Sequence, residues 1–255
     1  MSERRMEKTV ELDASPEQVW ELIATGPGIS TWFVPHEVEP RTGGTVKASF
    51  GGAFEGNGRV TAYQPGRRFG YAEPAPGDRP DHAFEFLVEG REGGGAVLRF
   101  VQSGFLDGPE GDAEYQGFDN GWNLFFTNLR TYLEHFAGQP VSNVLTMGYT
   151  PGTAADAWSV LHRSLGLTGH PAVGEQVSLD GPQQITGVVD VATPEFLGIR
   201  SAHGLHRFGA EGDGGCGVSA YHYFYGDPVD AETLSKAWDA WLTELFPPSP
   251  QPVDA

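Results

Sequence analysis

The side chains in this sequence that are best suited to chemistry are histidines and a single cysteine. His203, His206, Cys216 and His222 form the densest group of potential metal ligands. If residues 199–208 form a strand, His203 and His206 lie on opposite faces of it, whereas the histidines of a helical His-Glu-x-x-His motif share one face. The spacing therefore predicts no metal site, and we expect the protein to need no cofactor.

Nucleophilic and phosphate-binding motifs are also missing from the sequence. Cys216 lies in a glycine-rich segment, residues 214–217, that is typical of a turn and carries no catalytic signature. No Gly-x-Ser-x-Gly elbow is present. The glycines at 93–95 lack the Lys-Ser/Thr ending of a phosphate loop and the strand-to-helix setting of a dinucleotide fingerprint. The sequence therefore assigns no catalytic residue, and whether the protein is an enzyme stays open.

Aromatic residues at helical spacing form the clearest pattern in the N-terminal half. Phe118, Trp122, Phe125, Phe126 and Leu129 recur every three or four residues and predict one apolar face of a helix. Rings from the preceding strand-like runs can face this stripe and either fill a core or line an apolar pocket, and both interpretations stay open. The candidate pocket residues are Trp32, Phe50, Phe54, Tyr63, Tyr71, His82, Phe84, Phe86, Phe100, Trp122 and Phe126.

A few polar side chains stand among these rings and could orient a ligand hydroxyl or carbonyl. On a strand, His82 shares a face with Phe84 and Phe86 while Glu85 points to the other face, so His82 is the better cavity candidate. Its imidazole or the Tyr63 hydroxyl could move a proton in an enzyme, although a solvated or hydrogen-bonded histidine is the simpler interpretation. The wider polar set is His36, Tyr63, His82, Glu85, Gln102 and Asn123.

The N-terminal elements that must position these residues follow from local signals. Alternation over residues 7–13 predicts a strand, after which Ser15, Pro16 and Gln18 form a capping box that starts a helix. The long aromatic helix ends before the Gly-Gln-Pro segment at 138–140. Between the two helices the expected strands are short enough for an antiparallel meander, over residues 34–39, 45–50, 59–63, 69–73, 83–89 and 96–103.

The C-terminal half repeats this plan in a shorter form. Residues 144–149 predict a strand, Thr153 and Asp156 a looser helix start, and Asp230 the cap of a final helix. Residues 58–65 align without gaps with residues 187–194, and each segment ends in proline. We therefore expect two domains, residues 1–138 and 139–255. The second copy is expected to have lost strands or shortened its cavity.

The charge balance excludes several classes of partner. Acidic residues outnumber basic ones by 34 to 16, which gives a formal net charge of −18 at pH 7. Such a charge repels phosphate backbones and anionic lipid headgroups, so we expect neither nucleic acid nor a membrane as partner. The single cysteine excludes an internal disulfide, and no apolar run approaches the length of a membrane span or signal core. We therefore expect a cytoplasmic protein.

The N-terminal half resembles a known family. The residues that carry the resemblance are Ser15-Pro16, Val19-Trp20, Trp32-Phe33, Gly43-Gly44, Gly58-Arg59-Val60 with Pro65, Leu98-Arg99-Phe100, and Gly121-Trp122 leading to Leu129 and Leu133. They are similar to the bacterial AHSA1-like family (activator of Hsp90 ATPase homologue 1-like), within the START-like or Bet v 1-like (SRPBCC) helix-grip superfamily. Residues 6–137 carry the match, and residues 143–246 look like a degenerate second copy.

The resemblance implies an α+β helix-grip fold in two tandem copies, each with an antiparallel sheet wrapped on a long C-terminal helix and a cavity between them. It favours a binding protein for a small apolar or aromatic ligand, such as a lipid or polyketide-like metabolite. Two alternatives stay open, because one fold hosts unrelated activities. One is a polyketide cyclase or aromatase-like enzyme, and the other is a chaperone-partner interaction protein without a ligand. A homodimer built through the second copy also stays open.

Overall fold

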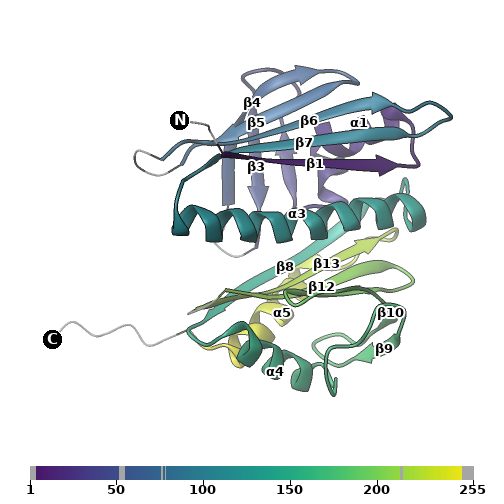
Figure 1. Ribbon diagram of the computed structural model, residues 1–255. Coiled ribbons are helices and arrows are strands. Elements are labelled where there is room, and N and C mark those ends of the chain that lie inside the picture. Colours follow the sequence, from purple (N-terminus) through teal and green to yellow (C-terminus); the bar gives the residue numbers. More distant parts are fainter. Residues whose placement is uncertain (1–3, 52–54, 76, 78, 213–214, 249–255) are drawn as a thin grey trace. The chain divides into compact units, whose positions relative to one another are not determined.

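The computed structural model describes residues 4–51, 55–75, 77, 79–212 and 215–248 (Figure 1). The chain divides into two compact units, Met1–Pro140 (unit 1) and Val141–Ala255 (unit 2). Each unit contains one antiparallel sheet and a helix at its C-terminal end. The division falls between residues 140 and 141, where the sequence predicts it between 138 and 139.

Unit 1 has a sheet of seven antiparallel strands in the order β1-β7-β6-β5-β4-β3-β2. Its last helix, α3, runs along one face of this sheet (Figure 1). The elements are β1 (Arg4–Leu12), α1 (Pro16–Ala24), α2 (Gly26–Ser30), β2 (His36–Val38), β3 (Thr45–Ser49), β4 (Glu55–Gln64), β5 (Arg68–Glu73), β6 (His82–Gly90), β7 (Ala96–Phe105) and α3 (Pro109–His135).

The start of α1 follows the predicted capping box. The Gln18 amide donates to the Ser15 hydroxyl at 3.3 Å, and the Gln18 side chain accepts from the Ser15 amide at 2.9 Å. These bonds satisfy two backbone N–H groups that have no partner within the helix. Pro16 fits the first helical position because no backbone N–H is needed there. Helix α1 stops at Ala24, and Thr25 then caps α2.

The long helix α3 begins earlier than the aromatic stripe predicts. It covers 27 residues from Pro109, so two turns precede Phe118. Those turns contain glycines and acidic residues instead of apolar ones, and Glu110 and Asp112 lie in the first turn. Their carboxylates are favourable at a helix N-terminus, where the helix dipole is positive.

Unit 2 has a sheet of six antiparallel strands in the order β8-β13-β12-β11-β10-β9. This is the order of unit 1 without a counterpart of β2, and no counterpart of α2 follows α4 within the described residues, so the second copy is shorter as predicted. The elements are β8 (Val141–Thr150), α4 (Ala154–Ser164), β9 (Gln176–Leu179), β10 (Ile185–Ala192), β11 (Phe196–Arg200), β12 (Gly204–Glu211), β13 (Cys216–Tyr225) and α5 (Ala231–Leu245).

The two copies share a detail of strand register. In β4 the pairing with β5 shifts between Val60 and Ala62, and in β10 the pairing with β11 shifts between Val189 and Val191. These are aligned positions in the gap-free segment found in the sequence. Because such bulges bend a strand and increase its twist, the two sheets are deformed at the same place. The predicted α+β helix-grip fold in tandem copies is confirmed.

Two local predictions in unit 2 are wrong. Residues 199–208 do not form one strand, because β11 ends at Arg200 and β12 begins at Gly204, with His203 in the turn between them. Cys216 does not lie in a turn but is the first residue of β13, where it is fully buried. The interior of unit 2 is filled by large rings, and Trp238 of α5 contacts Phe208 at 5.9 Å and His222 at 4.1 Å between ring centroids.

Candidate ligand cavity

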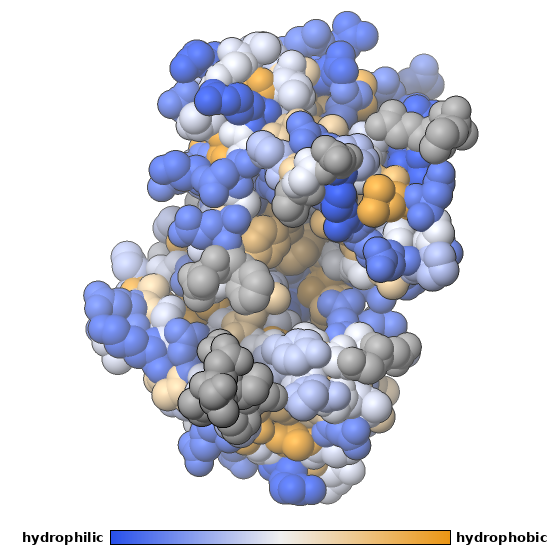
Figure 2. Space-filling view, turned by 90° about the vertical axis from the view of Figure 1, so that its left-hand side faces the viewer, coloured by the Kyte–Doolittle hydropathy of each residue, from blue (hydrophilic) through white to orange (hydrophobic). Residues whose placement is uncertain are grey.

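A cavity of about 480 Å³ lies between the sheet of unit 1 and α3. Of the eleven lining residues, six are phenylalanines or a tryptophan and two are glycines of α3, and the other three are two glutamates and a tyrosine. The side of the molecule at which α3 begins shows apolar surface recessed among hydrophilic side chains (Figure 2). The lining residues are Phe33, Phe50, Tyr71, Glu73, Phe84, Glu114, Gly117, Phe118, Gly121, Trp122 and Phe125.

Helix α3 creates part of the space by placing glycines on its cavity face. Gly117 and Gly121 are four residues apart, so they lie one turn above the other on the stripe that also carries Trp122 and Phe125. A Cβ added at Gly117 would meet no atom within 4 Å, and one at Gly121 would meet only the Phe125 ring at 3.9 Å. The volume in front of both glycines is therefore open.

Strand β4 leaves room for the Glu73 side chain. Gly56 and Gly58 lie on one face of β4, and the Glu73 side chain of β5 lies over them. A Cβ at Gly56 would come within 2.7 Å of a Glu73 carboxylate oxygen, and a Cβ at Gly58 within 3.2 Å of the Glu73 Cγ atom. A larger residue at either position would push Glu73 away, so these glycines set the position of its carboxylate.

The aromatic wall is held together by ring contacts. The rings of Phe33 and Phe125 meet edge to face at 4.4 Å, and those of Tyr71 and Phe84 stack at 4.7 Å. Phe84 lies 6.1 Å from Trp122, which joins the sheet rings to the helix rings. Such pairs add about 0.5–1.5 kcal/mol each beyond area burial, so the wall is rigid before any ligand enters.

Trp122 is fixed by a buried hydrogen bond. Its indole Nε1–H donates to the Gln102 side-chain oxygen of β7 at 2.7 Å, and Gln102 is completely buried. Phe100 packs behind the indole at 4.2 Å between centroids. The hydrogen bond and the ring contact together hold the indole in one orientation, with its other face towards the cavity.

The polar groups of the cavity gather where β5 and β6 meet the start of α3. Burial raises the pKa of Glu73, and burial followed by the nearby Glu73 carboxylate raises the pKa of the Tyr71 hydroxyl well above its usual value. Glu114 of α3 accepts a hydrogen bond from Arg79 at 2.6 Å. His82, which pairs with Glu73 in the strand register, lies 3.5 Å from the same Glu114 oxygen. One end of an otherwise apolar cavity is thus acidic.

The structure separates the predicted pocket residues into groups. Phe50, Tyr71, Phe84 and Trp122 line the cavity. Trp32, Phe86, Phe100 and Phe126 are buried behind those rings as core, and Tyr63 packs against Trp20 at 5.4 Å instead. His82 packs on Phe118 at 5.2 Å beside the cavity, and Phe54 lies outside the described residues. Their roles as ligand contacts remain predictions.

None of the wider polar set lines the cavity. His36 is buried, its ring Nδ1 bonds the Val34 carbonyl at 2.8 Å, and burial lowers its pKa to about 4. Asn123 bonds Lys8, and Glu85 accepts from Arg68 at 2.7 Å. The lining residues absent from the predicted set are Phe33, Glu73, Glu114, Gly117, Phe118, Gly121 and Phe125.

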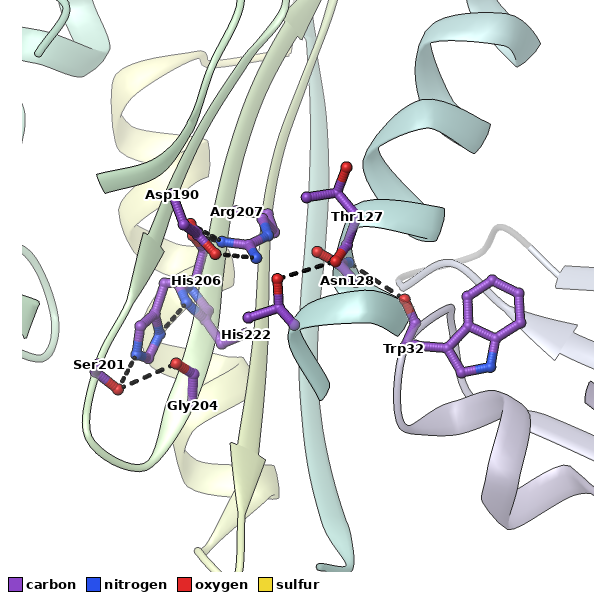
Figure 3. Close-up of polar contacts among 10 residues, drawn as sticks. Trp32, Thr127, Asn128, Asp190, Ser201, Gly204, His206, Arg207 and His222 are labelled. Atoms are coloured by element: carbon purple, nitrogen blue, oxygen red, sulfur yellow. Dashed lines mark hydrogen bonds and ion pairs between the residues drawn. The ribbon is translucent and has the colours of Figure 1, made fainter. Parts of the chain in front are cut away.

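The histidines of unit 2 form a buried pair rather than a ligand cluster. The Nδ1 atoms of His206 and His222 are 3.1 Å apart, and the other His206 nitrogen lies 3.1 Å from the Ser201 hydroxyl (Figure 3). Burial lowers the pKa of His206 to about 3 and that of His222 well below its usual value, so both rings are neutral near pH 7. No group of three potential metal ligands occurs within the described residues.

A buried ion pair lies on the same sheet. Arg207 of β12 donates through both terminal nitrogens to the two carboxylate oxygens of Asp190, each at 2.8 Å (Figure 3). Asp190 occupies the bulge of β10, and Gly198 opposite makes room, because a Cβ there would come within 2.6 Å of Arg207. The pair is therefore a structural feature of the sheet of unit 2.

Most of the N-terminal unit matches a family model. Residues 13–134 match the family model described as Activator of Hsp90 ATPase homolog 1-like protein, which confirms the resemblance seen in the sequence. No curated protein matches the chain at a significant level. None of the helices in the described ranges is long and apolar enough to cross a membrane.

Several solved structures are similar to this chain. Protein MLL2253 from Mesorhizobium loti is 23% identical over 51% of this chain and 97% of its own, with a TM-score of 0.47. DynU16, from the dynemicin biosynthetic locus, is 18% identical over 95% of this chain and 96% of its own, with a TM-score of 0.46. The di-domain ARO/CYC protein BexL of the BE-7585A biosynthetic pathway is 14% identical over 97% and 100%, with a TM-score of 0.47.

Proposed function

We propose that the AHSA1-like unit of this chain binds a small apolar or aromatic molecule, of the lipid or polyketide-like class, between its sheet and α3. The observation that carries the proposal is a cavity of about 480 Å³ bounded by interlocked aromatic rings. Ligand pockets usually measure about 300–1,000 Å³ and are lined mainly by apolar and aromatic groups with a few polar ones. The cavity has this size and this chemistry.

The expected affinity follows from the apolar surface that a ligand would bury. A two-ring aromatic molecule that buries on the order of 250 Å² gains roughly 6 kcal/mol at about 25 cal/mol per Å². Part of this gain offsets the loss of ligand freedom, but the walls need little ordering because Trp122 is already fixed by Gln102. We expect dissociation constants of about 0.1–1 mM for such a probe, and tighter binding for a ligand that fills the cavity.

Native mass spectrometry of the full chain, purified without denaturation, tests the proposal. We expect a co-purifying small molecule of defined mass in a ratio of one per chain. Calorimetric titration with 2-(1-naphthyl)ethanol is the second measurement, and it should give saturable one-site binding. A bare chain in the spectrometer together with no saturable heat up to millimolar probe would overturn the proposal.

A cyclase or aromatase-like enzyme is the second candidate, because two polar side chains lie together on the cavity wall. Tyr71 and Glu73 share one face of β5, and both line the cavity. Burial raises the pKa of the Glu73 carboxyl group, and carboxyl groups serve as general acids and bases in enzymes. Incubation with a linear poly-β-ketone tests this candidate. An enzyme would speed cyclisation, and Glu73→Gln would remove that effect while leaving 2-(1-naphthyl)ethanol bound.

The chaperone-partner alternative draws no support from unit 1. A docking surface would need an exposed apolar patch, and large exposed apolar side chains among the described residues are confined to unit 2. They are Met147, Tyr149 and Val173.

A further inference from the structure

The Glu73 carboxylate is a half-buried acid without a cationic partner. It lines the cavity, yet no hydrogen bond or ion pair joins it to any described residue. The other cavity glutamate differs, since Glu114 is neutralised by Arg79 at 2.6 Å. Burial raises the pKa of Glu73 because nothing repays the lost hydration of its charge. A carboxylate of this kind can repay that cost by binding a cation or a hydrogen-bond donor.

The Tyr71 hydroxyl is a second polar group without a partner. Tyr71 is only 2% exposed and lines the cavity, but its hydroxyl makes no hydrogen bond with a described residue. It stands two residues before Glu73, on the same face of β5. Neither group is among the fully buried side-chain atoms that lack a partner, so both are open to a molecule in the cavity. Two neighbouring groups that both lack a partner therefore indicate a ligand group that serves them together.

The surrounding rings favour a positive charge at this position. Phe33, Tyr71, Phe84, Trp122 and Phe125 all line the same cavity. The faces of aromatic rings attract cations, and the attraction grows where water is excluded. The net charge of −18 also raises the local concentration of cations and disfavours anionic ligands.

We propose that the ligand of this cavity carries a protonated amine, which binds the Glu73 carboxylate and the Tyr71 hydroxyl while its apolar body packs on the aromatic wall. This inference rests on the proposed binding function and narrows its ligand class from apolar molecules in general to cationic amphiphiles. The ammonium N–H groups donate to Glu73 and to the Tyr71 oxygen, which satisfies both groups at once.

The test uses two probes of equal shape, 2-(1-naphthyl)ethylamine and 2-(1-naphthyl)ethanol, with calorimetric titration of the full chain at pH 7.5. The wild type should bind the amine at least about tenfold more tightly than the alcohol, because only the amine forms a charge-assisted hydrogen bond with the Glu73 carboxylate. Glu73→Gln keeps the shape of the side chain and should remove this preference, so that the two probes bind with similar affinity. Tyr71→Phe should reduce the preference in part.

Glu89→Gln is the matched control, because it removes the same charge from a residue of β6 that does not line the cavity. The amine preference should survive in this variant. Equal binding of the two probes to the wild type would overturn the inference but leave the proposed function standing. Equal loss of preference in Glu89→Gln and Glu73→Gln would also overturn it, because the preference would then be a long-range charge effect. Failure of both probes to bind would instead overturn the proposed function.

Discussion

Replacing Gly117 and Gly121 together by leucine is expected to stabilise unit 1 and to weaken ligand binding at the same time. Both glycines lie on the cavity face of α3, and the volume in front of them is open. One leucine side chain can account for up to about 150 Å³ of buried space. Two leucines would therefore take up as much as about 60% of the 480 Å³ cavity without a clash with the backbone.

The expected stabilisation has two sources. A glycine inside a helix costs about 0.8–1 kcal/mol relative to a good helix former, so the two replacements contribute roughly 1.5 kcal/mol. Burying on the order of 60 Å² of leucine surface at about 25 cal/mol per Å² adds about 1.5 kcal/mol, of which side-chain entropy removes about half. The net gain of about 2 kcal/mol corresponds to a rise in Tm of about 6 °C for a unit of this size.

The assay combines thermal unfolding with calorimetric titration of 2-(1-naphthyl)ethanol. Gln116→Leu with Asn120→Leu is the matched control, because it places the same pair of leucines one position earlier on α3, outside the cavity lining. The cavity variant should lose affinity at least about tenfold, and the control should bind as the wild type does. A cavity variant that is more stable and still binds the probe fully would refute the reasoning, since the probe would then occupy another site.

Three further predictions concern buried polar groups. Gln102→Leu leaves the indole N–H of the cavity tryptophan without an acceptor and should lower the free energy of unfolding by about 1–3 kcal/mol in denaturant titration. Arg207→Ala should lower the free energy of unfolding by about 3–5 kcal/mol, because it leaves the partner carboxylate unpaired. The double variant Arg207→Met/Asp190→Leu should lower it less, because no buried charge is then left unpaired. An equal loss in the two variants would contradict this. The pKa of His206 is about 3 in the folded chain and about 6.5 when unfolded, and that of His222 is lowered as well, so unit 2 should be fully stable above pH 6.5 and lose stability as pH falls towards 3. A Tm of unit 2 that does not fall over this range would be inconsistent with neutral buried rings.

Much of the fold could be predicted because its signals are local. Ser15 and Gln18 form a capping box with a short sequence signature, and the structure contains both of its hydrogen bonds. The gap-free match of residues 58–65 with 187–194 corresponds to β4 and β10, which occupy equivalent places in their sheets. Tertiary packing does not have to be known for either inference.

The sequence does not predict the start of α3, and the reason is connected with the cavity. Helix prediction relies on an apolar stripe, and that stripe fades before Phe118 because the helix faces open space there instead of a packed core. Gly117 and Glu114 occupy the positions where large apolar residues would otherwise stand. The feature that hides the first two turns of the helix from a periodicity argument is therefore the feature that leaves room for a ligand.

The candidate site could be predicted only in part, because the sequence does not show which residues of an apolar face line a cavity and which pack in the core behind it. Phe84 and Phe86 share a face of β6, yet only Phe84 reaches the cavity. Trp32 and Phe33 are adjacent, and it is Phe33 that lines the wall. Glu73 is indistinguishable in sequence from the many surface acids, and its importance follows from its position over Gly56 and beside the cavity, which only the folded sheet creates.

The central claim is that a small molecule enters the cavity beside Trp122, and its most direct test is a ¹H–¹⁵N spectrum of the labelled full chain during titration with 2-(1-naphthyl)ethanol. The sequence contains six tryptophans, of which only Trp122 lines the cavity among the described residues, and Trp122→Phe identifies its indole signal. We predict that the Trp122 signal shifts most and saturates, while that of Trp238, in the core of unit 2, stays in place. A Trp122 signal that does not move at millimolar probe would contradict the account.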